Sequence, residues 1–207
     1  MNSAPTRPLR FLALGDSYTI GEGVSPGERW PEQLVELLRA DGSAGLEAPT
    51  VIARTGWTTD ELAHAIDESS VRGPFDLVSL LIGVNNQYRG RPLDEFRPQF
   101  RALLDRSVSF AGGLAARVVV VSIPDWGVTP FARNRDRVQI GLEIDAFNVV
   151  VREEAALGGA AFVDVTTVSR TAASNPESVG ADGLHPSARL YRQWAELVLP
   201  VAAAILA

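Results

Sequence analysis

Short apolar runs alternate along the chain with longer segments in which apolar residues recur every three or four positions. Runs rich in Val, Ile and Leu are typical of strands that are buried on both faces. They predict five strands, at residues 10–15, 50–53, 76–83, 117–123 and 161–165. The segments between them each carry one apolar stripe. They predict helices over residues 30–40, 59–69, 93–112, 139–157 and 186–206.

This alternation of strand and helix predicts a three-layer α/β fold with a doubly wound parallel sheet. For five strands we expect the flavodoxin-like order 2-1-3-4-5, chosen because it is common among folds of this kind. That order makes strands 1 and 3 neighbours, and ligands bind beyond the carboxyl ends of such strands. Two long connections, 17–28 and 166–185, begin at strand carboxyl ends and are predicted to be functional loops.

The length of 207 residues predicts one domain, at residues 10–207, after an N-terminal tail at residues 1–9. Hydrophobic residues make up 46 % and charged residues 21 %, as in ordinary globular proteins. The net charge of −6 argues against a general nucleic-acid binder, which would be basic. The chain has no cysteine, which excludes disulfides, thiolate chemistry and cysteine-bound zinc.

Targeting and cofactor signals are also missing from the sequence. Residues 1–10 lack the apolar segment of a signal peptide, so we expect a cytoplasmic protein. The apolar stretch 197–207 is too short for a transmembrane segment, which takes about 20 residues. No phosphate-binding glycine loop follows a strand, and residues 15–23 are acidic where a phosphate would lie. We therefore expect no cofactor and no metal.

A candidate nucleophile follows the first predicted strand, in Gly15-Asp16-Ser17. A serine hydroxyl needs a neighbouring base to attack a carbonyl carbon. Near the other end, Asp182 precedes His185 by three residues, close enough for a carboxylate to orient an imidazole. Pro186 is expected in the first turn of the last helix and restricts the residue before it to extended geometry. Each motif alone is also typical of an ordinary turn or helix cap.

Acyl transfer also needs hydrogen-bond donors for the developing oxyanion. Gly56 and Asn85 follow the second and third predicted strands, so both would flank Ser17 in the expected sheet. Glycine and asparagine are equally common in plain turns.

Taken together and in this order, the motifs resemble those of the SGNH (GDSL-like) hydrolase family. The matching stretches are GDSYT at 15–19, Gly56, GVNN at 83–86 and DGLHP at 182–186. The resemblance covers nearly the whole chain and implies a serine esterase or lipase with a flavodoxin-like fold. It implies that Ser17 is the nucleophile, that His185 is the general base and then the acid, and that Asp182 orients His185.

The resemblance further implies an oxyanion hole formed by the Ser17 N–H, the Gly56 N–H and the Asn85 side chain. Asp16 would support the loop without transferring a proton. The chain departs from the family at Asn86, where members usually carry aspartate, so the neighbour of Asn85 is neutral.

Several residues near the same strand ends are candidates for contacting substrate, since ligand pockets are mostly apolar and aromatic. We expect such contacts from Trp57, Asn86, Tyr88, Trp126 and Leu184. Core packing is an equal alternative for the apolar members. Arg89 and Arg91 either attract an anionic substrate or are simply solvated.

The sequence therefore predicts hydrolysis of small-molecule carboxylic esters. Short acyl groups are favoured because no lid-like insertion is visible. Two alternatives remain open: an acyltransferase that uses the same triad, and a non-catalytic binding module. The oligomeric state is not predicted.

Overall fold

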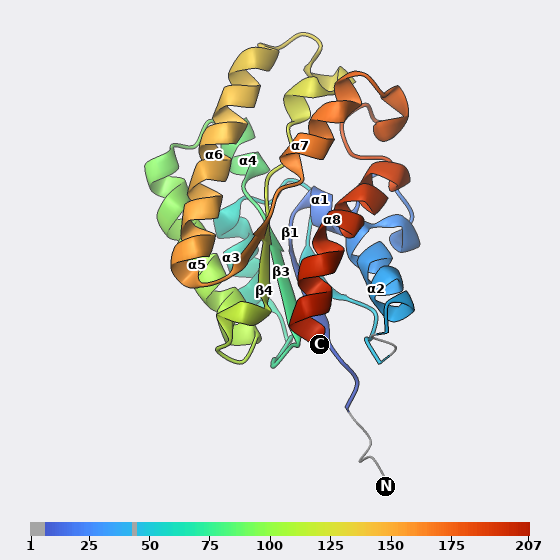
Figure 1. The fold of residues 1–207 in the computed structure, drawn as a ribbon. Coiled ribbons are helices and arrows are strands. Elements are labelled where there is room, and N and C mark those ends of the chain that lie inside the picture. The colour runs from blue at the N-terminus through green and yellow to red at the C-terminus, as the bar shows by residue number, and fades with distance from the viewer. Residues whose placement is uncertain (1–6, 43–44) are drawn as a thin grey trace, which may run out of the picture.

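Five parallel strands form the middle layer of the computed structural model, which describes residues 7–42 and 45–207 (Figure 1). They are β1 (Phe11–Gly15), β2 (Thr50–Ala53), β3 (Leu77–Leu81), β4 (Val118–Val121) and β5 (Ala161–Val163). Their order is β2-β1-β3-β4-β5, which confirms the predicted flavodoxin-like sheet. Residues 1–6 of the predicted tail lie outside the described residues. Arg7 and Leu9 already contact the domain, through an ion pair with Asp76 and a bridge to Leu46.

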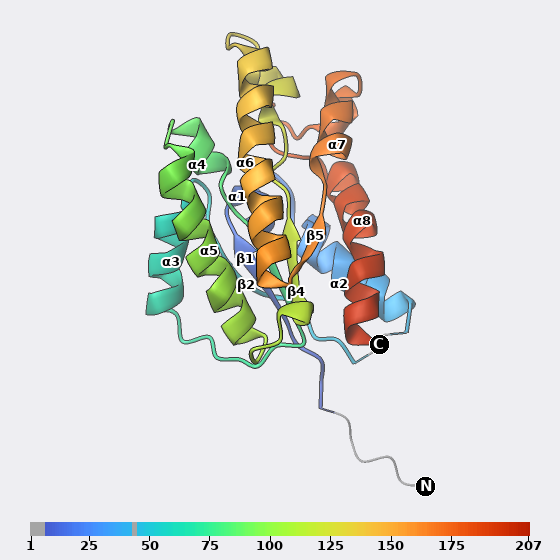
Figure 2. The same cartoon turned by 60° about the vertical axis from the view of Figure 1, so that its left-hand side comes forward.

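Helices cover both faces of the sheet, as predicted for a three-layer fold. α2 (Trp30–Ala40) and α8 (Ala188–Leu206) pack together on one face. α3 (Thr59–Glu68), α5 (Leu93–Phe110) and α6 (Arg137–Gly158) cover the other face (Figure 2). None of these helices, within the described part of the chain, has the length and apolar character that crossing a membrane requires.

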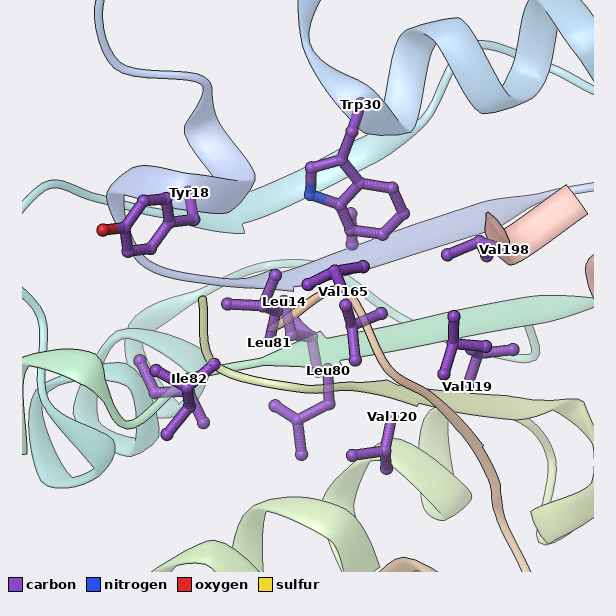
Figure 3. Packing of buried hydrophobic residues seen from close by; sticks show 14 of the residues in the cluster. Leu14, Tyr18, Trp30, Leu80, Leu81, Ile82, Val119, Val120, Val165 and Val198 are labelled. Carbon is purple, nitrogen blue, oxygen red and sulfur yellow. The ribbon is translucent and has the colours of Figure 1, made fainter. Parts of the chain in front are cut away.

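The core lies on both sides of the sheet because successive side chains of a strand point to opposite faces. Every residue of β1, β3 and β4 is buried. Trp30 and Val198 pack on the α2–α8 side, while Leu80 and Val120 lie on the other side (Figure 3). The apolar runs of the sequence are thus explained by double-sided burial.

Three short helices begin at or near the carboxyl ends of strands: α1 (Ser17–Ile20), α4 (Val84–Tyr88) and α7 (Thr166–Ser169). All three lie at the end of the sheet opposite the C-terminus (Figure 1). Residues 17–28 and 166–185, predicted from the sequence as loops, are in part helical. Both contain helical turns, including 3₁₀ turns at Pro26–Glu28, Arg170–Ala173 and Pro176–Ser178. Each element is too short to show a helical period in the sequence.

The start of the last helix also differs from the prediction. α8 begins at Ala188 after the cap residue Ser187, so Pro186 lies outside its first turn. The reason is pairing between two extended segments: Gly180 N–H donates to the His185 carbonyl at 2.7 Å, and Ser187 N–H donates to the Ser178 carbonyl at 2.9 Å. This pairing fixes the backbone around His185 more firmly than a fraying helix end would.

Candidate active site

Ser17 stands directly beyond the carboxyl end of β1, at the start of α1. Gly15 makes this tight exit possible, because a Cβ atom there would collide with the Thr19 side chain and the Leu81 carbonyl. The Asp16 carboxylate caps α1 by accepting from Tyr18 N–H at 3.0 Å. Ser17 is therefore held at the switch point between β1 and β3, where a nucleophile was expected from the sequence.

Asp16 itself is fully buried, and one of its carboxylate oxygens has no hydrogen-bond partner among the described residues. Burial raises the pKa of this carboxyl from 3.8 to about 7, against the lowering effect of the Tyr18 N–H bond. The loss of hydration disfavours the charged carboxylate more strongly than the backbone hydrogen bonds favour it. Asp16 thus caps the turn that carries Ser17.

Asp182 and His185 form a pair within one compact turn. His185 Nδ1 lies 2.6 Å from Asp182 Oδ2. Asp182 Oδ1 accepts from the backbone N–H groups of Leu184 at 2.9 Å and His185 at 3.0 Å. Gly183 has φ +72°, a left-handed conformation that closes the turn at little steric cost. The contact between the two side chains is thus made within one turn, and a bond of 2.9 Å from Phe131 N–H to the Gly183 carbonyl ties this turn to the rest of the fold.

The electrostatics of the turn keep Asp182 ionised. Burial raises the pKa of its carboxyl. The hydrogen bonds from the His185 ring and the two backbone N–H groups lower the pKa by more than burial raises it, so the pKa lies below its ordinary value. A carboxylate that accepts from Nδ1 fixes the neutral imidazole in the tautomer whose Nε2 is free to accept a proton. The ring of His185 is almost buried and lies edge-on to Tyr18, with ring centroids 5.5 Å apart.

The chain after β2 makes a tight turn around Gly56. Trp57 N–H donates to the Arg54 carbonyl at 3.3 Å, and Gly56 has φ +88°. Thr55 does not have a positive φ, so the turn has the type II pattern, which favours glycine at its third position. Among the described residues, none accepts from the Gly56 N–H. Asn85, in α4, donates from Nδ2 to the Trp57 carbonyl at 2.9 Å, which orients its amide.

A cavity of about 190 Å³ joins these groups. Ser17, His185, Gly56 and Asn85 all line it. The other lining residues are mainly apolar or aromatic: Tyr18, Thr55, Val84, Tyr88, Trp126, Phe131 and Leu184. The structure thus brings the candidate nucleophile, base and oxyanion donors to one space from four separate parts of the sequence.

Three of the residues expected to contact substrate, Tyr88, Trp126 and Leu184, line this cavity, and two do not. Asn86 is fully buried, accepts from Thr59 N–H at 3.1 Å and donates to Thr59 Oγ1 at 2.8 Å. Trp57 packs against the core. The motif alone does not distinguish a residue that lines a cavity from one that packs behind it, and the substrate contacts of Trp57 and Asn86 stay predictions.

Phe131 was missed by the sequence analysis. Its ring lies 6.4 Å from Tyr88 and 6.0 Å from Trp126, so the three rings form one aromatic wall. A topological signal was available, because Phe131 follows the fourth strand at the same edge of the sheet as Ser17.

The two arginines beside Tyr88 are engaged by the protein itself. Arg89 pairs with Glu61 at 3.3 Å, and Arg91 pairs with Asp60 at 2.6 Å. Neither guanidinium lines the cavity. The interpretation that they attract an anionic substrate is therefore not supported. No group of three or more His, Asp or Glu side chains that could hold a metal ion occurs within residues 7–42 and 45–207.

Comparison with known proteins assigns the chain to a class of enzymes and then to a family. The model of the GDSL-like lipase/acylhydrolase family matches residues 13–193. The chain is therefore a carboxylic ester hydrolase and belongs to the GDSL-like lipase/acylhydrolase family. A search of curated protein sequences found no significant match.

Solved structures share the fold at low sequence identity. A structure of TesA has a TM-score of 0.70 and 18 % identity, with 95 % of this chain and 99 % of that chain covered. Axe2, an acetylxylan esterase from Geobacillus stearothermophilus, has a TM-score of 0.72 and 20 % identity, with 95 % and 94 % covered. A lipolytic G-D-S-L family protein from Veillonella parvula has a TM-score of 0.67 and 21 % identity, with 93 % and 97 % covered.

Proposed function

We propose that Ser17, His185 and Asp182 form a catalytic triad that hydrolyses short-chain carboxylic esters through an acyl-enzyme. One observation carries the proposal: Ser17 and His185, whose ring is held by Asp182, line the same small, mostly apolar cavity. A buried serine beside an oriented imidazole is the arrangement that nucleophilic acyl transfer requires.

The reaction follows from the positions of these groups. His185 Nε2 takes the Ser17 hydroxyl proton while Oγ attacks the carbonyl carbon of the ester. The oxyanion accepts hydrogen bonds from the N–H groups of Ser17 and Gly56 and from Asn85 Nδ2. The bond to the alcohol oxygen breaks, and the alcohol leaves with the proton held by His185. Water then gives its proton to His185, attacks the acyl-enzyme and releases the acid and Ser17.

The size of the cavity supports a small acyl group. Pockets for drug-sized ligands enclose about 300–1,000 Å³, whereas this cavity measures about 190 Å³. Its aromatic wall of Tyr88, Trp126 and Phe131 suits an apolar group such as a short acyl chain. Axe2, which shares the fold, is an acetylxylan esterase, and an acetyl ester is within the range proposed here.

Hydrolysis of p-nitrophenyl esters from acetate to octanoate tests the proposal. The wild type should prefer the shortest chains, and Ser17→Ala should lose essentially all activity. Ser174→Ala, which alters an exposed serine, serves as the matched control and should behave as wild type. A fluorophosphonate should label the wild type on Ser17, as peptide mass spectrometry would report.

Two results would overturn the proposal. Full activity in Ser17→Ala would remove Ser17 as the nucleophile. A folded wild type that neither hydrolyses these esters nor reacts with the fluorophosphonate would favour a binding module. Acyl transfer to an added alcohol that exceeds hydrolysis would instead identify a transferase with the same triad.

A further inference from the structure

The turn at residues 54–59, which we call the Gly56 turn, is held by side chains from α4 and the residue that follows it. Arg89 Nη2 donates to the Gly56 carbonyl at 2.7 Å. Asn85 Nδ2 donates to the Trp57 carbonyl at 2.9 Å. Asn86 Oδ1 accepts from Thr59 N–H at 3.1 Å. The two segments lie about 30 residues apart in sequence, so these bonds are tertiary contacts. α4 lies at the same end of the sheet as α1, which begins at Ser17 (Figure 1).

Arg89 holds the Gly56 carbonyl and is itself held in place by Glu61. Its Nη1 and Nη2 atoms both lie 3.3 Å from carboxylate oxygens of Glu61. Glu61 Oε2 in turn accepts from Thr58 N–H at 2.8 Å, in the capping box of α3. One guanidinium therefore joins α3, the end of α4 and the carbonyl of Gly56. A planar group with donors in fixed directions suits this bridging better than a flexible ammonium.

The Gly56 carbonyl is the atom that most needs such a restraint. Glycine has no Cβ atom and can visit many backbone conformations, so the φ of +88° is not enforced by the residue itself. The turn's own bond, from Trp57 N–H to the Arg54 carbonyl, is long at 3.3 Å. The bond from Arg89 fixes the peptide that follows Gly56. It thereby limits the conformations open to Gly56, which lines the cavity and whose N–H is the proposed oxyanion donor.

We infer that Arg89 is a positioning residue for the oxyanion hole, acting through the Gly56 carbonyl. This inference rests on the proposed function, in which the Gly56 N–H stabilises the oxyanion. Arg89 is not among the residues that line the cavity, so it acts on the donor and not on the substrate. Its removal should weaken stabilisation of the transition state and leave binding of the ground-state ester unchanged.

Arg89→Met and Arg89→Lys test the inference, with Arg91→Met as the matched control. Arg91 pairs with Asp60 and Glu95 beside the same helix, but among the described residues it donates to no backbone atom of the Gly56 turn. Loss of a whole oxyanion donor lowers kcat by about 10²–10³. Loosening one donor among three should lower kcat by about tenfold in Arg89→Met, with KM within about twofold of wild type.

Arg89→Lys keeps the charge and one possible donor, so its kcat should lie between those of Arg89→Met and wild type. A trifluoromethyl ketone, which forms an oxyanion with a serine nucleophile, should bind Arg89→Met more weakly by the same factor as kcat falls. The binding of a product carboxylate should not change. Urea denaturation checks that all three variants fold, and Arg89→Lys, which keeps the positive charge, keeps the test decisive should Arg89→Met be unfolded.

The outcomes separate this inference from the proposed function. A wild type that is active and labelled on Ser17, together with an Arg89→Met variant of unchanged kcat, would overturn the positioning role alone. An equal loss of kcat in Arg91→Met would also overturn it, because the cause would then be charge or stability. A rise in KM with unchanged kcat would assign Arg89 to substrate binding instead.

Discussion

The replacement Asp182→Asn gives the sharpest test of how His185 is oriented. The carboxamide oxygen can take the place of Oδ1 and keep the bonds from the backbone N–H groups of Leu184 and His185. The amide NH₂ then takes the place of Oδ2, which lies 2.6 Å from His185 Nδ1. Two donors would face each other across this contact. The imidazole relieves the conflict by moving its proton to Nε2, the nitrogen that must accept from Ser17.

These contacts set the expected losses of kcat and of folding stability in Asp182→Asn. A histidine held in the wrong tautomer costs serine hydrolases about 10⁴ in kcat, which corresponds to about 5 kcal/mol in activation free energy. The cost in folding is much smaller, because two of the three bonds to the side chain remain. Removing the third costs about 1 kcal/mol, since the Asp182 side chain is 38 % exposed and water can replace part of the interaction. The variant should therefore fold and be nearly inactive.

Steady-state hydrolysis of p-nitrophenyl acetate and urea denaturation measure the two quantities separately. Glu177→Gln, which neutralises an exposed carboxylate close by in sequence, is the control for charge and should keep wild-type values. The reasoning is refuted by an Asp182→Asn variant whose kcat/KM equals that of wild type. It is refuted equally by a loss of activity that merely follows a loss of folded protein.

Three further changes test other parts of the account. Burial raises the pKa of Asp16 from 3.8 to about 7, so the wild type loses stability as the pH rises between these values. Asp16→Asn avoids this loss. Its stability relative to wild type in urea should therefore rise from pH 5 to pH 8, by up to about 3 kcal/mol, and a constant difference would contradict the raised pKa. Gly15→Ala should destabilise the fold by about 1–3 kcal/mol in urea through overpacking. Gly27→Ala, whose Cβ would meet open space, should change stability by no more than about 0.5 kcal/mol, and equal effects would exclude steric crowding at Gly15. Phe131→Ala removes one ring of the cavity wall, so kcat/KM for p-nitrophenyl octanoate should rise relative to acetate, and an unchanged profile would place the acyl group elsewhere.

The sheet could be predicted from the sequence because double-sided burial leaves continuous apolar runs. β2 and α2 have the predicted bounds. The third strand was predicted too long, because Ile82 is as deeply buried as the strand before it although β3 ends at Leu81. The apolar pattern of the sequence indicates which residues are buried, whereas a strand ends where its backbone hydrogen bonds to the neighbouring strands end. The turn of α4 at Val84–Tyr88 was missed because it is too short to show a helical period.

In the candidate site, too, some contacts could be predicted from the sequence and others could not. Asp182 and His185 are three residues apart, so their contact was visible as a local pattern. The approach of Ser17 to His185 depended on the order of the strands and was only implied by the resemblance to a family. The bond from Arg89 to Gly56 joins residues 33 positions apart and leaves no local signal. Contacts of this kind require the folded arrangement of three neighbouring strands.

The proposed nucleophile and its base lie far apart in the sequence of the domain, Ser17 just after β1 and His185 shortly before α8. During synthesis, Ser17 leaves the ribosome early and remains without its base until His185 has emerged. α8 must follow and pack against α2. A chain truncated before that point would carry a serine without hydrolytic power. On the proposed mechanism, the protein gains esterase activity only after His185 has been translated, so that activity reports molecules that extend at least through His185.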